Sequence, residues 1–563
     1  MNRKLCVSLL SIAAFVSAGV MEGRAETLMT RHVREATING QAKLLGRLPA
    51  TQIMQLDIVL PMRDRDGLHA FLADLYSSTV PNYRHFLTPA EFTERFGPTQ
   101  EHYDAVVKYA QEHGMAVVGG SRDGMEVQVR GPVSAVEAAF HVSLLAYQHP
   151  TENRIFYGPD REPTVDLPFA LWHISGLDNY SIPHPMFVKK SDYAKAHGIS
   201  SEDVVRHATT GSGPSASFLG SDMRAAYYGG TALTGAGQNL GLFEYLGTDL
   251  ADLTTYFKNA KQTNNVPITL LSTDGTSTSC VDSRAGGRCD DTEQTLDMTQ
   301  AIGMAPGLAS LVMYIGSTDT AIISSMTTHS PLPTTIGCSW GWTPADPTTL
   351  DPYFEKMASQ GQNFFVASGD DSTWKKTGDA ESWPADDANI VAVGGTDLTT
   401  ASAAGPWKSE TAWVDSGGGI SPNDVAIPSW QQLAGVINSS NKGSTKYRNG
   451  PDVSANANFT FYVCADQTTC TANDYGGTSF AAPMWAGYIA LVNQQLAADG
   501  YSTIGFINPY LYSFGVSSSY GTDFHDITSG KSGSYTAVTG YDLVTGWGSP
   551  NGQGLINALV GEK

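Results

Sequence analysis

Apolar runs and amphipathic segments alternate along the second half of the chain. The runs have the length of strands buried on both faces, at 239–245, 309–315, 335–339, 363–368 and 389–393. Apolar residues with helical spacing fill the gaps, at 249–261, 292–302, 321–329 and 349–360. This alternation predicts an α/β domain with a doubly wound parallel sheet over residues 215–563. Functional groups in such sheets gather at the carboxyl ends of the strands.

The first half has a different pattern. Residues 53–60 are typical of a strand, and Leu68, Phe71, Leu72 and Leu75 are spaced as on one helix face. A capping box at 88–91, with proline at the first helical position, begins another helix. Further helices are expected at 99–113 and 133–140, and a hairpin at 115–118 and 125–129. The prediction for residues 26–182 is a small α+β domain with an antiparallel sheet and helices on one face.

Two short segments flank this first domain. Residues 1–25 begin with a charged region of Arg3 and Lys4, followed by an apolar stretch and small residues, as in a secretory signal peptide. A membrane anchor is the alternative, but the stretch is short and contains several serines. We therefore expect a secreted, extracellular protein. Residues 183–214 are polar and bracketed by prolines and glycines, so we expect an exposed linker that is easily cut.

Composition excludes several classes of protein. At 563 residues, with 41% hydrophobic and 16% charged residues, the chain is globular and long enough for more than one domain. The net charge of −21 argues against a nucleic-acid surface. No apolar run after the signal is long enough to cross a membrane.

The six cysteines fit export. Cys6 leaves with the signal, while Cys280/Cys289 and Cys464/Cys470 are close enough in sequence to close small loops as disulfides. Cys338 is left over within an apolar run, where a buried, inert thiol is expected.

The strongest chemical signal is Ser479, in the motif Gly-Gly-Thr-Ser-Phe-Ala-Ala-Pro at 476–483. The glycines allow a tight turn, and the predicted helix that follows places the hydroxyl at a helix N-terminus, where free N–H groups can hold an oxyanion. The alternative is a serine that only caps the helix.

A nucleophilic serine needs a base, and histidine is scarce where it is needed. Eleven of the 13 histidines lie at or before His207. After residue 210, a single glutamate has an aspartate four positions later, Glu293 with Asp297. This spacing puts both carboxylates on one helix face, where they titrate as a pair. Such a pair can accept the proton of Ser479 in mild acid. The alternative is a solvated helix face.

Asp370 directly follows the predicted strand at 363–368. A protonated aspartate there can donate a hydrogen bond to an oxyanion. The alternative is a turn residue.

Taken together, the motif at 477–483, the pair Glu293 and Asp297, and Ser-Gly-Asp at 368–370 resemble the sedolisins, or serine-carboxyl peptidases. Residues 50–180 resemble the family's activation prodomain, most clearly at 86–92 and 95–98. The resemblance implies a subtilisin-like fold with Ser479 as nucleophile, Glu293 as general base and acid, Asp297 orienting Glu293, and Asp370 in the oxyanion hole. It also implies that residues 338–341 pair with a substrate backbone in the cleft.

A calcium site is also implied near the C-terminus. Asp526 and Asp542 are hard oxygen ligands beside glycine-rich turns. By resemblance, their side chains bind one structural Ca²⁺ with the carbonyls of Ile527, Val538 and Gly540. The family commonly has glycine where this chain has Val538, so this ligand departs from the pattern. The alternative is two aspartates that cap turns.

The sequence therefore predicts a self-processing endopeptidase that acts in acid on proteins or peptides. Its own prodomain is the expected intramolecular inhibitor, and a monomer is expected. A tripeptidyl exopeptidase of the same family and a non-catalytic, protease-like binding module remain alternatives. A histidine-dependent serine hydrolase is disfavoured by the shortage of histidine after residue 207.

Overall fold

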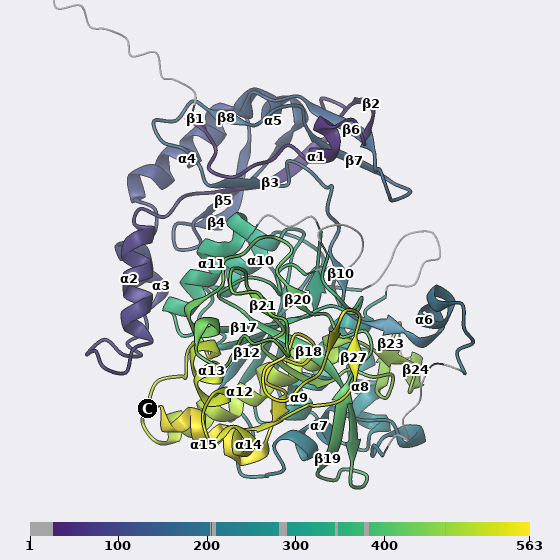
Figure 1. Cartoon of the computed structure of the whole chain (residues 1–563). Coiled ribbons are helices and arrows are strands. Elements are labelled where there is room, and N and C mark those ends of the chain that lie inside the picture. The colour runs from purple at the N-terminus through teal and green to yellow at the C-terminus, as the bar shows by residue number, and fades with distance from the viewer. Residues whose placement is uncertain are drawn as a thin grey trace, which may run out of the picture.

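The computed structural model describes residues 26–202, 204, 210–280, 290–343, 347–375, 382–467 and 469–562. The predicted signal peptide at 1–25 lies outside the described residues, as does Cys289. Figure 1 shows a smaller N-terminal body, purple to blue, above a larger body that runs from teal to yellow. Among the described helices, none is long and apolar enough to cross a membrane.

The larger body is built on one eight-stranded sheet. Seven strands follow in the order β13-β14-β12-β15-β17-β18-β19, and β22 also pairs with β18. All neighbours are parallel except β18 and β19. The bounds are β12 Asn239–Glu244, β13 Ile268–Ser272, β14 Ser310–Ile315, β15 Thr335–Cys338, β17 Asn363–Ala367, β18 Val391–Thr400, β19 Trp407–Ala412 and β22 Val453–Asn456. The predicted parallel α/β fold is confirmed, with β13, β19 and β22 as strands that the apolar pattern does not predict.

Helices cover both faces of this sheet. On one face, α9 and α12 pack against each other and share an apolar core with the sheet. On the other face, α10 and α11 contribute to a second core. The bounds are α8 Leu250–Asn259, α9 Thr292–Met304, α10 Asp319–Met326, α11 Pro347–Ser359 and α12 Ala481–Ala498. Because α9 and α12 are neighbours, residues from their N-terminal turns can meet.

The smaller body has a four-stranded antiparallel sheet in the order β4-β5-β3-β9 and a three-stranded one, β2-β6-β7. Helices α4 and α5 bury their apolar residues against β3 and β5. The strand bounds are β2 Lys43–Arg47, β3 Ile53–Val59, β4 Ala116–Ser121, β5 Glu126–Pro132, β6 Leu144–Gln148, β7 Ile155–Pro159 and β9 His173–Ser175. The helices are α2 Arg65–Leu75, α3 Pro89–Arg95, α4 Gln100–Glu112 and α5 Val133–Phe140. The predicted antiparallel α+β domain is confirmed, including the capping box of Thr88 and Glu91.

The two bodies share an extensive interface. Helices α2 and α3 extend down the side of the larger body (Figure 1), and their apolar residues belong to the same buried cluster as those of α11. Arg65 of α2 donates to Glu355 of α11 at 2.7 Å. The β3 carboxylate of Asp57 accepts from the hydroxyl of Thr320, in the first turn of α10, at 3.1 Å. The N-terminal body therefore covers the α10–α11 face of the larger one.

Candidate active site

Ser479 lies in a short 3-10 helix, Thr478–Phe480, directly before α12. Gly477, with φ +140°, makes the turn into this helix. The serine is completely buried, and its Oγ donates a hydrogen bond to Oε2 of Glu293 at 2.9 Å. The structure thus brings the predicted nucleophile and the predicted base into direct contact.

Glu293 and Asp297 lie one turn apart on α9, where their buried carboxyl groups interact with each other. Burial raises the pKa of Asp297 to about 7. Burial and the neighbouring carboxylates raise the pKa of Glu293 well above its ordinary value. Ser339 donates to Oδ1 of Asp297 at 2.7 Å and so fixes its orientation. Two buried carboxyl groups in contact are stable only if they share a proton.

A third buried carboxylate, Glu244, adjoins this pair and is not among the residues predicted from the sequence. It ends β12, lies beside Asp297, and accepts from Gln294 at 3.0 Å and from the Trp340 indole at 3.1 Å. Burial, followed by the charge of Asp297, raises its pKa well above the ordinary value. The sequence feature that could have indicated Glu244 is a glutamate at the carboxyl end of a buried strand, where functional groups gather.

Asp370 follows β17 and faces Thr478, whose N–H and hydroxyl each donate to Oδ1 at 2.8 Å. Its Oδ2 is buried and has no hydrogen-bond partner among the described residues. Burial raises the pKa of Asp370 well above its ordinary value. A neutral Asp370 would carry its proton on the unpartnered oxygen, where it can be donated.

A segment of the same chain passes directly over Ser479. The N–H of Ser479 donates to the carbonyl of Met186 at 3.0 Å, and the N–H of Met186 donates to the carbonyl of Ser339 at 2.8 Å. Before Met186, strand β10 (His184–Pro185) pairs with β16 (Trp340–Gly341). The predicted cleft strand at 338–341 therefore does pair with a peptide backbone.

This path corrects part of the linker prediction. The segment is bound rather than exposed near Ser479, and Met186 is only 6% exposed. The prolines and lysines of this segment predict exposure to solvent, but hydrogen bonds to the cleft hold its backbone in place. Gly477 allows the close approach, since a Cβ there would lie 2.4 Å from the Met186 carbonyl oxygen.

The predicted calcium residues also lie together. A carboxylate oxygen of Asp526 accepts from the N–H of Gly540 at 3.2 Å, and Asp542 accepts from the N–H of Val538 at 3.0 Å. Ile527 is next to Asp526 and is buried. Burial raises the pKa of Asp542 to about 7. Carboxylates are oxygen ligands of the kind that calcium prefers, and in the structure both of these accept hydrogen bonds from backbone N–H groups of residues 538–545.

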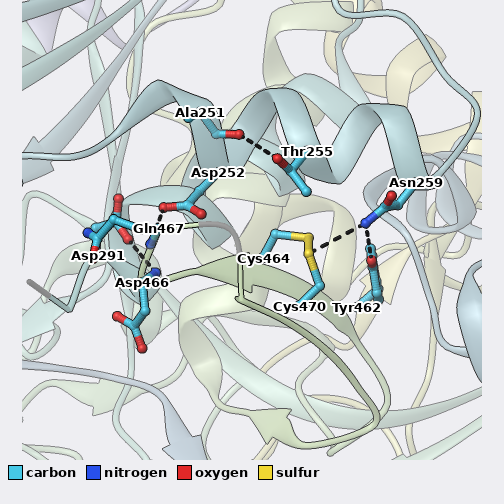
Figure 2. Close-up of a disulfide and its surroundings, with 10 residues drawn as sticks. All are labelled: Ala251, Asp252, Thr255, Asn259, Asp291, Tyr462, Cys464, Asp466, Gln467 and Cys470. Carbon is cyan, nitrogen blue, oxygen red and sulfur yellow. Dashed lines mark hydrogen bonds between the residues drawn. A yellow bond between two sulfur atoms is a disulfide. The ribbon is translucent and has the colours of Figure 1, made fainter. Parts of the chain in front are cut away.

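The predicted cysteine pair Cys464 and Cys470 is joined in the structure (Figure 2), whereas the pair of Cys280 includes Cys289, which lies outside the described residues. It closes a hairpin of β23 (Tyr462–Ala465) and β24 (Thr469–Ala472). In its turn, the N–H of Asp466 donates to Asp291 at 3.0 Å, and Asp291 directly precedes α9. The hairpin is thus tied to the start of the helix that carries Glu293. Cys338 is a buried thiol, as expected.

The two late histidines lie elsewhere. His525 stacks on Trp407 with ring centroids 3.9 Å apart, and His329 lies edge-on to Tyr314. The contact that Ser479 makes with an ionisable side chain is with Glu293.

Two family models match the chain, "Pro-kumamolisin, activation domain" at residues 40–179 and "Subtilase family" at 296–504. Kumamolisin of Bacillus sp. (strain MN-32) is 29% identical over 96% of this chain and 97% of its own length. Sedolisin of Pseudomonas sp. (strain 101) is 27% identical over 98% and 95%, respectively.

The chain belongs to the sedolisin family. It is a serine-carboxyl peptidase with an activation prodomain. Canine tripeptidyl-peptidase 1 is 30% identical, over 37% of this chain and 39% of its own length. A solved structure of Pseudomonas sedolisin, complexed with two molecules of pseudo-iodotyrostatin, is 27% identical and covers 60% of this chain and 96% of that one, with a TM-score of 0.48.

Proposed function

We propose that this sedolisin is a secreted endopeptidase that acts in acid and is made as a self-processing zymogen. The observation that supports this best is the 2.9 Å hydrogen bond from Ser479 to Glu293 beneath a bound peptide carbonyl. A serine activated by a carboxylate, with its own N–H on that carbonyl, has the arrangement needed for acyl transfer.

In the proposed reaction, Ser479 attacks the substrate carbonyl carbon while Glu293 accepts the hydroxyl proton. The N–H of Ser479 and a neutral Asp370 hydrogen-bond the oxyanion that forms. Glu293 then protonates the leaving nitrogen, and an acyl-enzyme remains on Ser479. Water is activated in the same way and releases the acid.

Acid is needed because two groups must hold protons. Asp370 donates to an oxyanion only when neutral, and the pair of Glu293 and Asp297 is stable only with a shared proton. The raised pKa values of all three groups keep these protons bound in acid, and the protons are lost as the pH rises. Activity should therefore be high in acid and fall toward neutral and higher pH.

The prodomain inhibits by occupying the cleft with its own linker. The chain continues on both sides of Met186, upstream into β10 and downstream into β11 (Val188–Lys189), which pairs with β25 (Tyr475–Gly476). A cleft that holds a chain on both sides of the serine favours an endopeptidase over a tripeptidyl exopeptidase. A non-catalytic binding module is disfavoured, because it would not require a hydrogen bond from a serine to a buried carboxylate.

Calcium is part of the proposal as a structural ion. The carboxylates of Asp526 and Asp542 and the carbonyls of Ile527, Val538 and Gly540 would hold it. When bound, it would offset the charge of the two carboxylates and fix the loops that carry them. It has no part in the acyl transfer.

The test is hydrolysis of an N-acetylated peptide of about ten residues at about pH 4. An endopeptidase cuts it internally, whereas a tripeptidyl peptidase needs a free N-terminus. Ser479→Ala should be inactive, and the exposed control Ser439→Ala should match the wild type. A wild-type protein that hydrolyses no peptide at any pH would contradict the proposal.

A further inference from the structure

The chain between residues 184 and 190 is held in one register across the cleft. Upstream of Ser479, His184 and Pro185 pair with Gly341 and Trp340. Downstream, β11 pairs with β25, and the N–H of Lys190 donates to the carbonyl of Asp474 at 2.8 Å. Between these two anchored stretches lies the peptide bond from Met186 to Phe187.

This bond is the one that faces the nucleophile. The Met186 carbonyl accepts from the N–H of Ser479 at 3.0 Å, the donor expected to hold an oxyanion. The position of a Cβ on Gly477 would be 2.4 Å from that carbonyl oxygen and 2.6 Å from Cα of Phe187. Both residues of the bond therefore lie against Gly477, which directly precedes Thr478 and Ser479 in the sequence.

Resting on the proposed function, we infer that Met186–Phe187 is the bond that the precursor cuts in itself. Ser479 Oγ would bond to the Met186 carbonyl carbon, with its proton passing to Glu293. The bond from that carbon to the Phe187 nitrogen breaks, and Glu293 gives the proton to this nitrogen, which becomes a new N-terminus. Water then adds to the acyl carbon through Glu293, Ser479 recovers its proton, and Met186 ends in a carboxylate.

A register shift by one residue is disfavoured. With Pro185 in the place of Met186, no N–H would be available to donate to the Ser339 carbonyl. A one-residue slip also turns every side chain to the other face of the strand. Met186, which is 6% exposed in the observed register, would then lose its buried place.

The same register indicates a substrate class. Met186 belongs to the large apolar cluster that includes Phe461 and Phe480, so the acyl side of the cleft accepts an unbranched apolar residue. Phe187 lies edge-on to Tyr475, with ring centroids 5.7 Å apart, so the leaving side accepts an aromatic residue. Peptides with such a pair around the cut bond should be good substrates.

The experiment shifts the purified full chain to about pH 4 and follows its fragments by intact mass spectrometry over time. The first fragments should end at Met186 and begin at Phe187. Because the bond is held by its own chain, the first-order rate constant should not depend on protein concentration.

A variant pair tests the register. Met186→Lys buries a charge in an apolar place and should slow this cut by about tenfold or more. Ile199→Lys changes a residue of the same linker that is 43% exposed, and should mature normally. Residue 186 is absent from the mature enzyme, so Met186→Lys that is trimmed by immobilised wild-type enzyme, and assayed after that enzyme is removed, should hydrolyse the acetylated peptide at the wild-type rate. That measurement excludes misfolding.

Two results would overturn the inference. One is a first new N-terminus at another residue, in a wild-type protein that does hydrolyse the acetylated peptide. The other is Met186→Lys cutting after residue 186 at the normal rate. Both leave the proposed endopeptidase activity intact, which falls if the wild type does not cut the acetylated peptide.

Discussion

Oδ2 of Asp370 and the carbonyl oxygen of Met186 converge on one point, the position that a Cβ on Gly477 would occupy, at 2.5 and 2.4 Å from it. Oδ2 is buried and accepts no hydrogen bond among the described residues. An ionised Asp370 would repel the negative charge that develops on a carbonyl oxygen, whereas a neutral one can donate to it. The role of Asp370 therefore depends on its protonation.

Replacing Asp370 separates these two states. Asp370→Asn keeps a donor that cannot ionise, while Asp370→Ala has none. Loss of one oxyanion donor costs roughly 100- to 1,000-fold in kcat, so the Ala enzyme should lose about that much and the Asn enzyme less. The measurement is kcat against pH, in variants whose prodomain has been removed by added active enzyme. On the alkaline side of the optimum (the alkaline limb of the profile), kcat of Asp370→Asn should fall less steeply than that of the wild type. If both variants lose the same amount of kcat, and the alkaline limb of Asp370→Asn matches that of the wild type, Asp370 is not a neutral donor.

Glu244 should set the pH range of the carboxylate pair. Burial and the charge of Asp297 raise the pKa of Glu293 most, and the charge of Glu244 raises it further. In Glu244→Gln that last contribution is absent, so the pKa of the pair falls, and the alkaline limb of kcat/KM should move to lower pH. Glu410 is another buried carboxylate with a raised pKa, and it accepts from Trp407 and not from the site.

Glu410→Gln is therefore the control. Glu410→Gln should lower the melting temperature without shifting the alkaline limb of kcat/KM. If both variants leave the pH profile unchanged, Glu244 acts only in packing.

The calcium site predicts a stability that depends on the metal. A ligand that binds only the folded state stabilises it by mass action. EDTA should lower the Tm of the mature enzyme and added calcium should restore it, while Asp542→Ala should melt low and ignore both. Asp499→Ala, at an exposed aspartate directly after α12, should respond as the wild type does. A wild-type Tm that neither reagent changes would remove the site.

The sequence is most informative where burial is continuous. Strand β12 has an apolar interior, Leu240–Phe243, because both of its faces are covered, and such runs predict the sheet. The edge strand β13 is only half-buried, so its pattern carries no such signal. Glu293 and Asp297 can be found in the sequence because their contact follows from helical spacing within α9.

Contacts made by the tertiary fold cannot be read in this way. Glu244 reaches Asp297 from another element, and no local spacing relates the two. The segment around Met186 has a composition typical of an exposed linker, and its burial comes from residues more than 150 positions away in sequence, at 339–341 and 475–479. Local patterns therefore predict the chemistry of the site but not the segment that occupies it.

The contact between the prodomain and α10 should depend on pH. Oδ2 of Asp57 accepts from Thr318 and Thr320, and burial raises the pKa of Asp57 to about 7. Asp274, Asp319 and the prodomain's own Glu126 face the same place and are also acidic. A folded pKa above the unfolded value of 3.8 means that this group's stabilisation is complete below about 4 and is lost as the pH rises through about 7.

Asp57→Asn should remove this dependence, because an amide can still accept from the two threonines but does not ionise. The measurement is Tm against pH in full-length Ser479→Ala protein, which cannot cut itself. The protein with both substitutions should have a higher Tm than the Ser479→Ala parent. This difference in Tm should be larger at pH 8 than at pH 5. Asp66→Asn, at an exposed aspartate of the prodomain, should not change the pH dependence.

Parallel Tm curves for the parent and the Asp57→Asn variant would show that Asp57 does not titrate in this range. If the curves instead diverge as the pH rises, acid strengthens this contact, because the neutral carboxyl group is the form that the interface stabilises. Release of the prodomain in acid then depends on cutting the linker rather than on loosening this interface.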